Sequence, residues 1–141
     1  MAVFTKLDRK DIEEFISSYD VGYLETFSEI IEGIENTNYK IICKGDPYIL
    51  TIFEKRVREE DLPFFIDLKL YLNTNNFKCP KPVKNKKEKI INSIKNKKAV
   101  LISFIEGKKI ESPNKNECYE VGKMIGKLHN LTINFDQIKK N

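Results

Sequence analysis

Three apolar, β-branched runs constrain the fold of this chain more than any other feature. They span residues 27–31, 39–43 and 48–53, and two turn-rich pieces separate them. Short runs of this kind, bounded by Gly, Asn, Asp and Pro, are typical of strands joined by hairpins. The second connection, residues 44–47, consists of ordinary turn residues. The sequence therefore predicts three consecutive antiparallel strands.

The first connection, residues 33–39, has the order Gly-Ile-Glu-Asn-Thr-Asn-Tyr. A loop of small and polar residues can turn its backbone N–H groups outward and leave room for an anion. A strand, a polar loop, a return strand and a third strand also form the cover over the ATP phosphates in kinases. Most loops of this composition are only hairpin loops, so the kinase interpretation depends on the later parts of the chain.

Composition excludes several classes of protein. The chain has 141 residues, 40% hydrophobic and 33% charged, which suits one soluble domain with a core. No apolar run approaches the roughly 20 residues of a membrane helix, and the N-terminus lacks the layout of a secretory signal. The three cysteines are scattered and show no Cys-x-x-Cys pair. We therefore expect a cytoplasmic protein without a membrane partner, a zinc site or a disulfide framework.

The net charge of +4 comes almost entirely from lysine, since Arg9, Arg56 and Arg58 are the only arginines. The densest lysine cluster covers residues 81–98. It has no interleaved aromatic residues for base stacking and no arginine for bidentate phosphate contacts. A solvated strand edge explains the cluster better than nucleic-acid binding, so no nucleic-acid partner is expected.

The remaining elements follow from helical and strand periodicity. Asp8 caps a first helix that ends near Gly22, and a second helix begins near Asp61. Residues 77–83 carry two prolines and form an extended strand edge, followed by strands around residues 90–94 and 99–105. The second of these is continuously apolar and therefore central. Ser112 or Asn114 caps a last helix, whose apolar face is Cys118, Val121, Gly122, Ile125, Leu128 and His129.

The predicted fold is α+β, with a five-stranded antiparallel sheet, an N-terminal helix and a helix inserted after the third strand. This is the layout of a protein-kinase-like small lobe. Four stretches, in order, carry a more specific likeness: residues 33–39, 48–65, 79–83 and 103–107. Over nearly its whole length the chain resembles the N-terminal part of bacterial homoserine kinases of the aminoglycoside phosphotransferase/choline kinase-like superfamily. The resemblance divides the chain into an ATP-binding lobe, residues 1–107, and a linker with the first helix of a second lobe, residues 108–141.

The resemblance implies ATP-dependent phosphoryl transfer to the hydroxyl of L-homoserine, with Mg²⁺, in threonine biosynthesis. The polar loop would cover the phosphates, and residues 103–106 would form the hinge that reads the adenine edge. A group on the third strand would stabilise the transferring phosphoryl. The candidate ATP-binding residues are Gly33, Ile34, Glu35, Asn36, Thr37, Asn38, Thr51, Lys55, Ser103, Phe104, Ile105 and Glu106.

The chain departs from the kinase pattern on the third strand and the inserted helix. Thr51 occupies the inward position where a lysine is expected, and Lys55 lies just beyond the strand. Either Lys55 takes that role, or the Thr51 hydroxyl and the loop amides suffice. The carboxylate partner expected on the helix falls near Phe65, and Glu59 and Glu60 are only stand-ins. A solvated Glu-Lys-Arg surface run explains these charges equally well.

The His-Gly-Asp catalytic triplet of the superfamily does not occur, and His129, the sole histidine, fits a packing role. We therefore expect no catalytic residue and no metal ligand here, and a fragment or degenerate gene product that is inactive alone. The last helix would fold back, swap or form a homodimer through its apolar face. Two other hypotheses stay open: the lobe of a sister kinase acting on choline or an aminoglycoside, and a non-catalytic interaction module.

Overall fold

A single antiparallel sheet carries the early and the late strands of the chain together. The computed structural model describes residues 4–32, 34–54 and 58–136. The strand order is β1-β2-β3-β5-β4. The strands are β1 (Leu24–Ile30), β2 (Thr37–Cys43), β3 (Asp46–Ile52), β4 (Asn92–Ile94) and β5 (Lys97–Ser103). The predicted α+β small-lobe fold is thus confirmed, although Ile90 and Ile91 precede β4 rather than belonging to it.

The strands divide their side chains between two faces of the sheet, because successive residues point to opposite sides. On one face the fully buried residues of β2, β3 and β5 form the core with the first helix. These are Tyr39, Ile41, Cys43, Leu50, Ile52, Ala99 and Leu101. Ala99, Val100 and Leu101 are all buried, which confirms that the apolar run beginning at residue 99 is an inner strand.

Helix α1 (Arg9–Ser17) covers the core face. Asp8 caps it and forms a reciprocal capping box with Asp11, as the sequence predicts for the cap. Ile12 and Ile16 are buried in the core. The helix ends earlier than predicted, but Gly22 does adopt a left-handed backbone with φ of +83°. A Cβ there would lie 2.9 Å from the Cβ of Lys44, so only glycine fits this turn.

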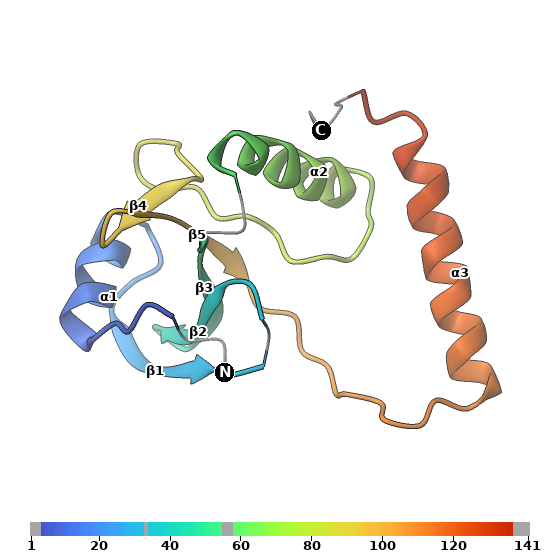
Figure 1. Cartoon of the computed structure of the whole chain (residues 1–141), viewed down its shortest axis with the longest axis horizontal. Helices are drawn as coiled ribbons and strands as arrows, with labels where there is room; N and C mark the ends of the chain where they lie inside the picture. Colours follow the sequence, from blue (N-terminus) through green and yellow to red (C-terminus); the bar gives the residue numbers. More distant parts are fainter. Residues whose placement is uncertain (1–3, 33, 55–57, 137–141) are drawn as a thin grey trace.

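Helix α2 (Leu62–Thr74) follows a short 3₁₀ turn, η1 (Glu59–Asp61), and has Pro63 in its first turn as expected. Figure 1 shows α2 on the side of the sheet away from α1. The proline-containing segment extends the β4 edge of the sheet. The N–H of Val83 donates to the carbonyl of Leu101 at 2.9 Å, which confirms the predicted extended edge.

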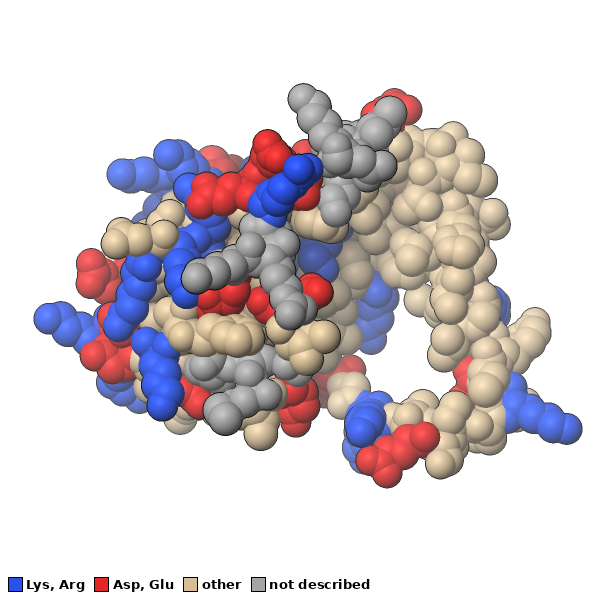
Figure 2. Space-filling view, in the orientation of Figure 1, with Lys and Arg blue, Asp and Glu red and all other residues tan. Residues whose placement is uncertain are grey.

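Helix α3 (Lys115–Thr132) stands apart from the sheet (Figure 1). The last turn of α3 meets α2, where the Tyr71 hydroxyl donates to the carbonyl of Leu131 at 3.0 Å. Asn114, one of the two predicted caps, forms a capping box with Glu117. The apolar face predicted to be covered is open, with Val121 at 56% and Ile125 at 47% exposure. Figure 2 shows few charged side chains over much of this region. The homodimer through this face stays a prediction, which gel filtration would test.

No helix in the described ranges is both long and apolar enough to span a membrane.

Candidate functional site

The sheet face opposite α1 is the candidate nucleotide-binding face. Strand register places Asn38 beside Thr51, and Lys40 beside Ile49, which in turn pairs with Ile102. These side chains alternate with the core residues and are all half-buried. The face thus combines an apolar surface with an amide, a hydroxyl and an ammonium group, which is the mixed lining typical of ligand sites.

Residues 34–36, the part of the predicted polar loop that the structure describes before β2, lie at one end of this face. Ile34 is 73% exposed and Glu35 is also exposed, so neither side chain anchors the loop. Behind it, the Thr51 hydroxyl donates to Oδ1 of Asn38 at 2.8 Å. The Asn38 amide donates in turn to the carbonyl of Asn36 at 3.4 Å. Gly33 lies outside the described residues, so the structure does not place this predicted site residue.

The predicted hinge lies at the other end of the same face. Ser103 is already engaged, because its N–H donates to the Lys81 carbonyl at 2.8 Å and its Oγ accepts from the Lys81 N–H at 2.9 Å. By contrast, no hydrogen bond within the described chain uses the backbone groups of Phe104, Ile105 or Glu106. The backbone donors and acceptors of these three residues are therefore available to a ligand, whereas the N–H of Ser103 is already used.

The loop and the hinge are therefore two ends of one surface. The loop enters β2 at Thr37, which pairs with Ile52 at the end of β3. Ser103 pairs with Tyr48, four residues before Ile52 in the same strand. At about 3.3 Å per residue, the two ends lie about 13 Å apart along the strands. A nucleotide lying along the strands would place its base at one end and its phosphates at the other.

The structure describes only some of the residues expected to carry charge near Thr51. Lys55 lies outside the described residues, and Phe65 is a partly exposed apolar residue of α2. Glu59 pairs with Lys98 of β5 at 3.5 Å, and its side chain is 69% exposed. Exposed pairs of this kind contribute little to stability, so this one is not evidence of a built ion-pair site.

Lys40 is a candidate that sequence reasoning missed. Its Nζ lies 4.3 Å from the centre of the Phe104 ring, within cation–π distance. The contact joins a cation on β2 to the hinge, across the face that Thr51 shares. The alternation of buried residues in β2 carries the signal, because Tyr39 and Ile41 are core residues and Lys40 must point to the opposite side.

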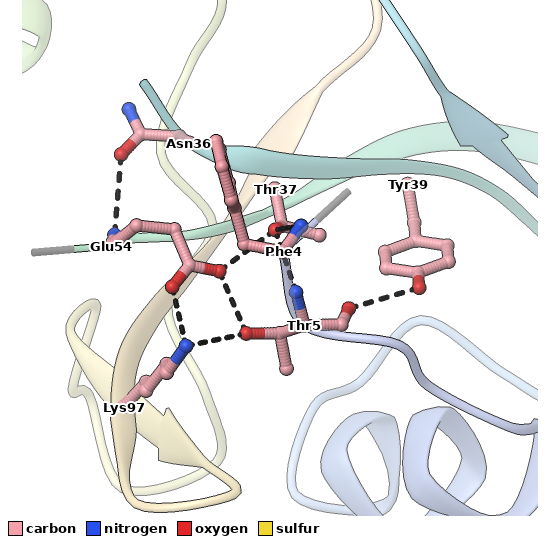
Figure 3. A network of polar contacts seen from close by, with 7 residues as sticks. All are labelled: Phe4, Thr5, Asn36, Thr37, Tyr39, Glu54 and Lys97. Atoms are coloured by element: carbon pink, nitrogen blue, oxygen red, sulfur yellow. Dashed lines mark hydrogen bonds and ion pairs between the residues drawn. The ribbon is translucent and has the colours of Figure 1, made fainter. Parts of the chain in front are cut away.

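Thr37 and Glu54 form a polar network behind the loop, on the core side of the sheet (Figure 3). The Thr37 hydroxyl donates to Oε1 of Glu54 at 2.7 Å, and the Thr5 hydroxyl donates to the same oxygen at 2.7 Å. Lys97 forms an ion pair with Oε2 of Glu54. The side chain of Thr37 thus points away from the nucleotide face, although the residue belongs to the predicted loop.

The Glu54 carboxylate is held in its charged form. Burial alone would raise its pKa, but the hydrogen bonds from Lys97, Thr5 and Thr37, together with the Lys97 charge, lower the pKa below the ordinary 4.5. Only 8% of the Glu54 side chain is exposed, so the carboxylate depends on these partners. The network is therefore an anchor for the chain segments that meet there.

The part of the chain that the structure describes holds no cluster of side chains that could bind Mg²⁺ by itself. There, no three His, Cys, Asp or Glu side chains come together as metal ligands. The described residues therefore do not fit a protein-held metal centre.

Comparison with known proteins decides the family. A family model described as "Phosphotransferase enzyme family" (APH) matches residues 26–141. The chain belongs to the phosphotransferase enzyme family. Crystallised spectinomycin phosphotransferase, APH(9)-Ia, in complex with ADP and spectinomycin, shares the fold with a TM-score of 0.57. That similarity covers 78% of this chain and 32% of the other, at 14% sequence identity.

The sequence relatives of this phosphotransferase-family chain carry the name homoserine kinase. The protein from Methylobacterium radiotolerans is 37% identical over 141 residues, which cover 100% of this chain and 44% of the relative. The protein from Rhodopseudomonas palustris is 38% identical over 141 residues and 43% of its own length. The chain thus spans less than half the length of these curated relatives.

Proposed function

We propose that this chain is the ATP-binding N-terminal part of a homoserine kinase. The whole enzyme would transfer the terminal phosphoryl group of ATP to the hydroxyl of L-homoserine, giving ADP and O-phospho-L-homoserine on the route to threonine. The observation that carries the proposal is the match of the whole chain to homoserine kinases at 37% and 38% identity. Mg²⁺ would accompany the nucleotide, as it does in phosphoryl transfer generally.

The sheet supports this proposal by offering separate ends for the two parts of the nucleotide. The backbone groups of residues 104–106, which make no hydrogen bond within the described part of the chain, would bind the base edge. Loop residues 34–36, with Asn38 and Thr51 behind them, would face the phosphates. Either Lys55 would supply the phosphate-binding cation, or the Thr51 hydroxyl and the loop amides would suffice. Since phosphoryl transfer depends on positioning and charge, these residues would orient ATP rather than react with it.

Calorimetric titration with AMP-PNP, a non-hydrolysable ATP analogue, and Mg²⁺ tests the nucleotide-binding part of the proposal. Saturable binding of one nucleotide per chain supports it. No heat at millimolar nucleotide would instead favour the non-catalytic interaction module. A matched titration with adenosine separates base recognition from phosphate recognition, because adenosine lacks the group that the loop would bind.

The acceptor is tested separately on the whole enzyme of which this chain would be the N-terminal part, because we expect the chain to be inactive alone. ADP formation from ATP is measured in the presence of L-homoserine, choline or an aminoglycoside. Release of ADP that depends on L-homoserine supports the homoserine kinase assignment. Release of ADP that depends on choline or an aminoglycoside would instead identify a sister kinase that acts on that acceptor. We propose a cytoplasmic location, because this biosynthetic reaction uses soluble intracellular substrates.

A further inference from the structure

Thr37 is the point at which the phosphate-side loop is tied to the rest of the protein. Its side chain is fully buried. Oγ1 accepts hydrogen bonds from the backbone N–H groups of Phe4, at 2.9 Å, and Thr5, at 3.1 Å. The same hydroxyl donates to Glu54 at 2.7 Å. One hydroxyl at the end of the loop thus holds together the N-terminal segment and the chain just beyond β3 (Figure 3).

Glu54 holds the loop through both its backbone and its side chain. Its backbone N–H donates to Oδ1 of Asn36, the last loop residue, at 3.4 Å. Its carboxylate accepts from Thr37 and Thr5 and pairs with Lys97. The Lys97 ammonium also donates to the Thr5 hydroxyl at 2.7 Å. Each of these side chains therefore has more than one partner in the network.

Apolar packing does little to hold the described loop residues. Ile31 is 61% exposed and Ile34 is 73% exposed, so these two side chains bury little apolar surface. An exposed loop without packing samples several conformations unless hydrogen bonds at its ends restrict it. The network around Thr37 is such a restriction. It lies on the core face of the sheet, so a nucleotide bound to the opposite face would leave it intact.

We propose that Thr5, Thr37, Glu54 and Lys97 form a loop clasp that keeps residues 34–36 in the conformation that receives the nucleotide phosphates. The four are positioning residues, since they act on the nucleotide only through the loop. This inference rests on the proposed nucleotide-binding function. It also gives the segment before α1 a role in the site, because the backbone of Phe4 and Thr5 supplies two of the three hydrogen bonds to Thr37.

The test removes one hydroxyl and keeps the shape of the side chain. Thr37→Val loses all three hydrogen bonds of Oγ1, whereas Thr37→Ser keeps the hydroxyl and serves as the conservative rescue. Ile16→Val, a core substitution in α1 outside the clasp, is the control for general loss of stability. AMP-PNP affinity with Mg²⁺ is measured for the wild type and the three variants well below their melting temperatures.

We expect Thr37→Val to weaken AMP-PNP binding about tenfold, because the apparent affinity falls with the fraction of loops in the competent conformation. Thr37→Ser and Ile16→Val should bind within about twofold of the wild type, since the loop fraction is unchanged. Unchanged affinity in Thr37→Val would overturn the proposal. So would an equal loss in Ile16→Val, because the effect would then follow stability rather than the loop.

A second variant and a second readout keep the clasp testable if Thr37→Val fails to fold. Lys97→Met changes a side chain that is 38% exposed and removes the cation from the clasp. Amide hydrogen exchange at residues 34–38, without nucleotide, should accelerate in either clasp variant and stay unchanged in Ile16→Val. If the wild type binds no AMP-PNP, the proposed function fails. The exchange data alone then test the clasp, and unchanged amide exchange at residues 34–38 in the clasp variants would contradict it.

Discussion

Thr51 and Asn38 are joined across β3 and β2 by a hydrogen bond of 2.8 Å from the Thr51 hydroxyl to Oδ1 of Asn38. The two residues are direct cross-strand partners on the face that carries the candidate site. Through its amide, Asn38 reaches the carbonyl of Asn36 in the loop. A threonine on the third strand thus orients the residue that supports the end of the loop.

Replacing Thr51 with valine should weaken nucleotide binding more than it weakens the fold. The substitution removes one half-buried hydrogen bond, which corresponds to about a 3- to 10-fold loss of AMP-PNP affinity if the bond orients the loop. Calorimetric titration measures the affinity, and thermal melting measures the stability. Thr26→Val, at an exposed position of β1, is the matched control and should change neither quantity. Equal affinities for Thr51→Val and the wild type would remove Thr51 from the site.

Much of the fold could be predicted because local signals and tertiary packing agree. The runs around Tyr39 and Leu50 became strands whose alternate residues fill the core. Asp8 and Asn114 cap helices as their types predict. What packs against the apolar face of the last helix could not be predicted in the same way. An apolar stripe such as Val121 and Ile125 indicates a buried face but does not say what buries it, and here that face is open.

The candidate site was harder to predict than the fold, because a side chain's direction depends on register. Thr37 belongs to the polar loop in sequence but points into the core, where it meets Thr5 and Glu54. Lys40 lies inside a strand and gives no motif signal, yet it reaches the hinge residue Phe104. Partners so far apart along the chain leave no trace in local patterns, so only the assembled sheet reveals them.

Lys40 should contribute positive charge to nucleotide binding. Lys40 lies on the candidate face with its ammonium group against the hinge residue Phe104, so it would attract the negatively charged triphosphate from a distance. Lys40→Met should weaken AMP-PNP binding about fivefold and reduce its dependence on salt, because one attractive charge is lost. Lys10→Met, on the exposed side of α1, controls for the change in net charge. If both variants behave alike, Lys40 acts only through the overall charge.

Glu54 should make the stability of the chain sensitive to acid. The pKa of Glu54 is lowered in the folded protein, so its contribution is complete above the ordinary value of 4.5 and is lost as the pH falls through the folded pKa. At pH 7, Glu54→Gln should cost about 1–2 kcal/mol, a figure reduced for the partial exposure of Lys97.

Urea unfolding of the wild type and Glu54→Gln at pH 7 and pH 3 measures this effect. The difference between the two proteins should be smaller at pH 3, because below the ordinary pKa of 4.5 the carboxylate of the unfolded chain takes up a proton and the stability that Glu54 contributes falls. Glu14→Gln, which replaces an exposed carboxylate of α1, should show no comparable difference at either pH. A difference for Glu54→Gln that stays constant with pH would mean that its charge does not stabilise the fold.

Phe135 should hold the end of α3 against α2 without supporting the sheet. Its ring centre lies 5.7 Å from that of Phe64 and 5.2 Å from that of Tyr71. Tyr71 also donates to the carbonyl of Leu131 at 3.0 Å. Phe135→Ala should therefore speed amide exchange in α3 while exchange in β2 and β3 stays unchanged, because these contacts are local. Faster exchange in the sheet would show that α3 supports the whole domain.

The position of the nucleotide tests the central claim most directly. Backbone amide chemical shifts are recorded while the isotopically labelled chain is titrated with AMP-PNP and Mg²⁺. We predict that the largest shifts cluster at residues 34–38, Thr51 and 104–106, at the two ends of one sheet face. Shifts concentrated instead along the lysine-lined groove of about 640 Å³ between α1 and the region around β4, or no shifts at millimolar nucleotide, would contradict the account.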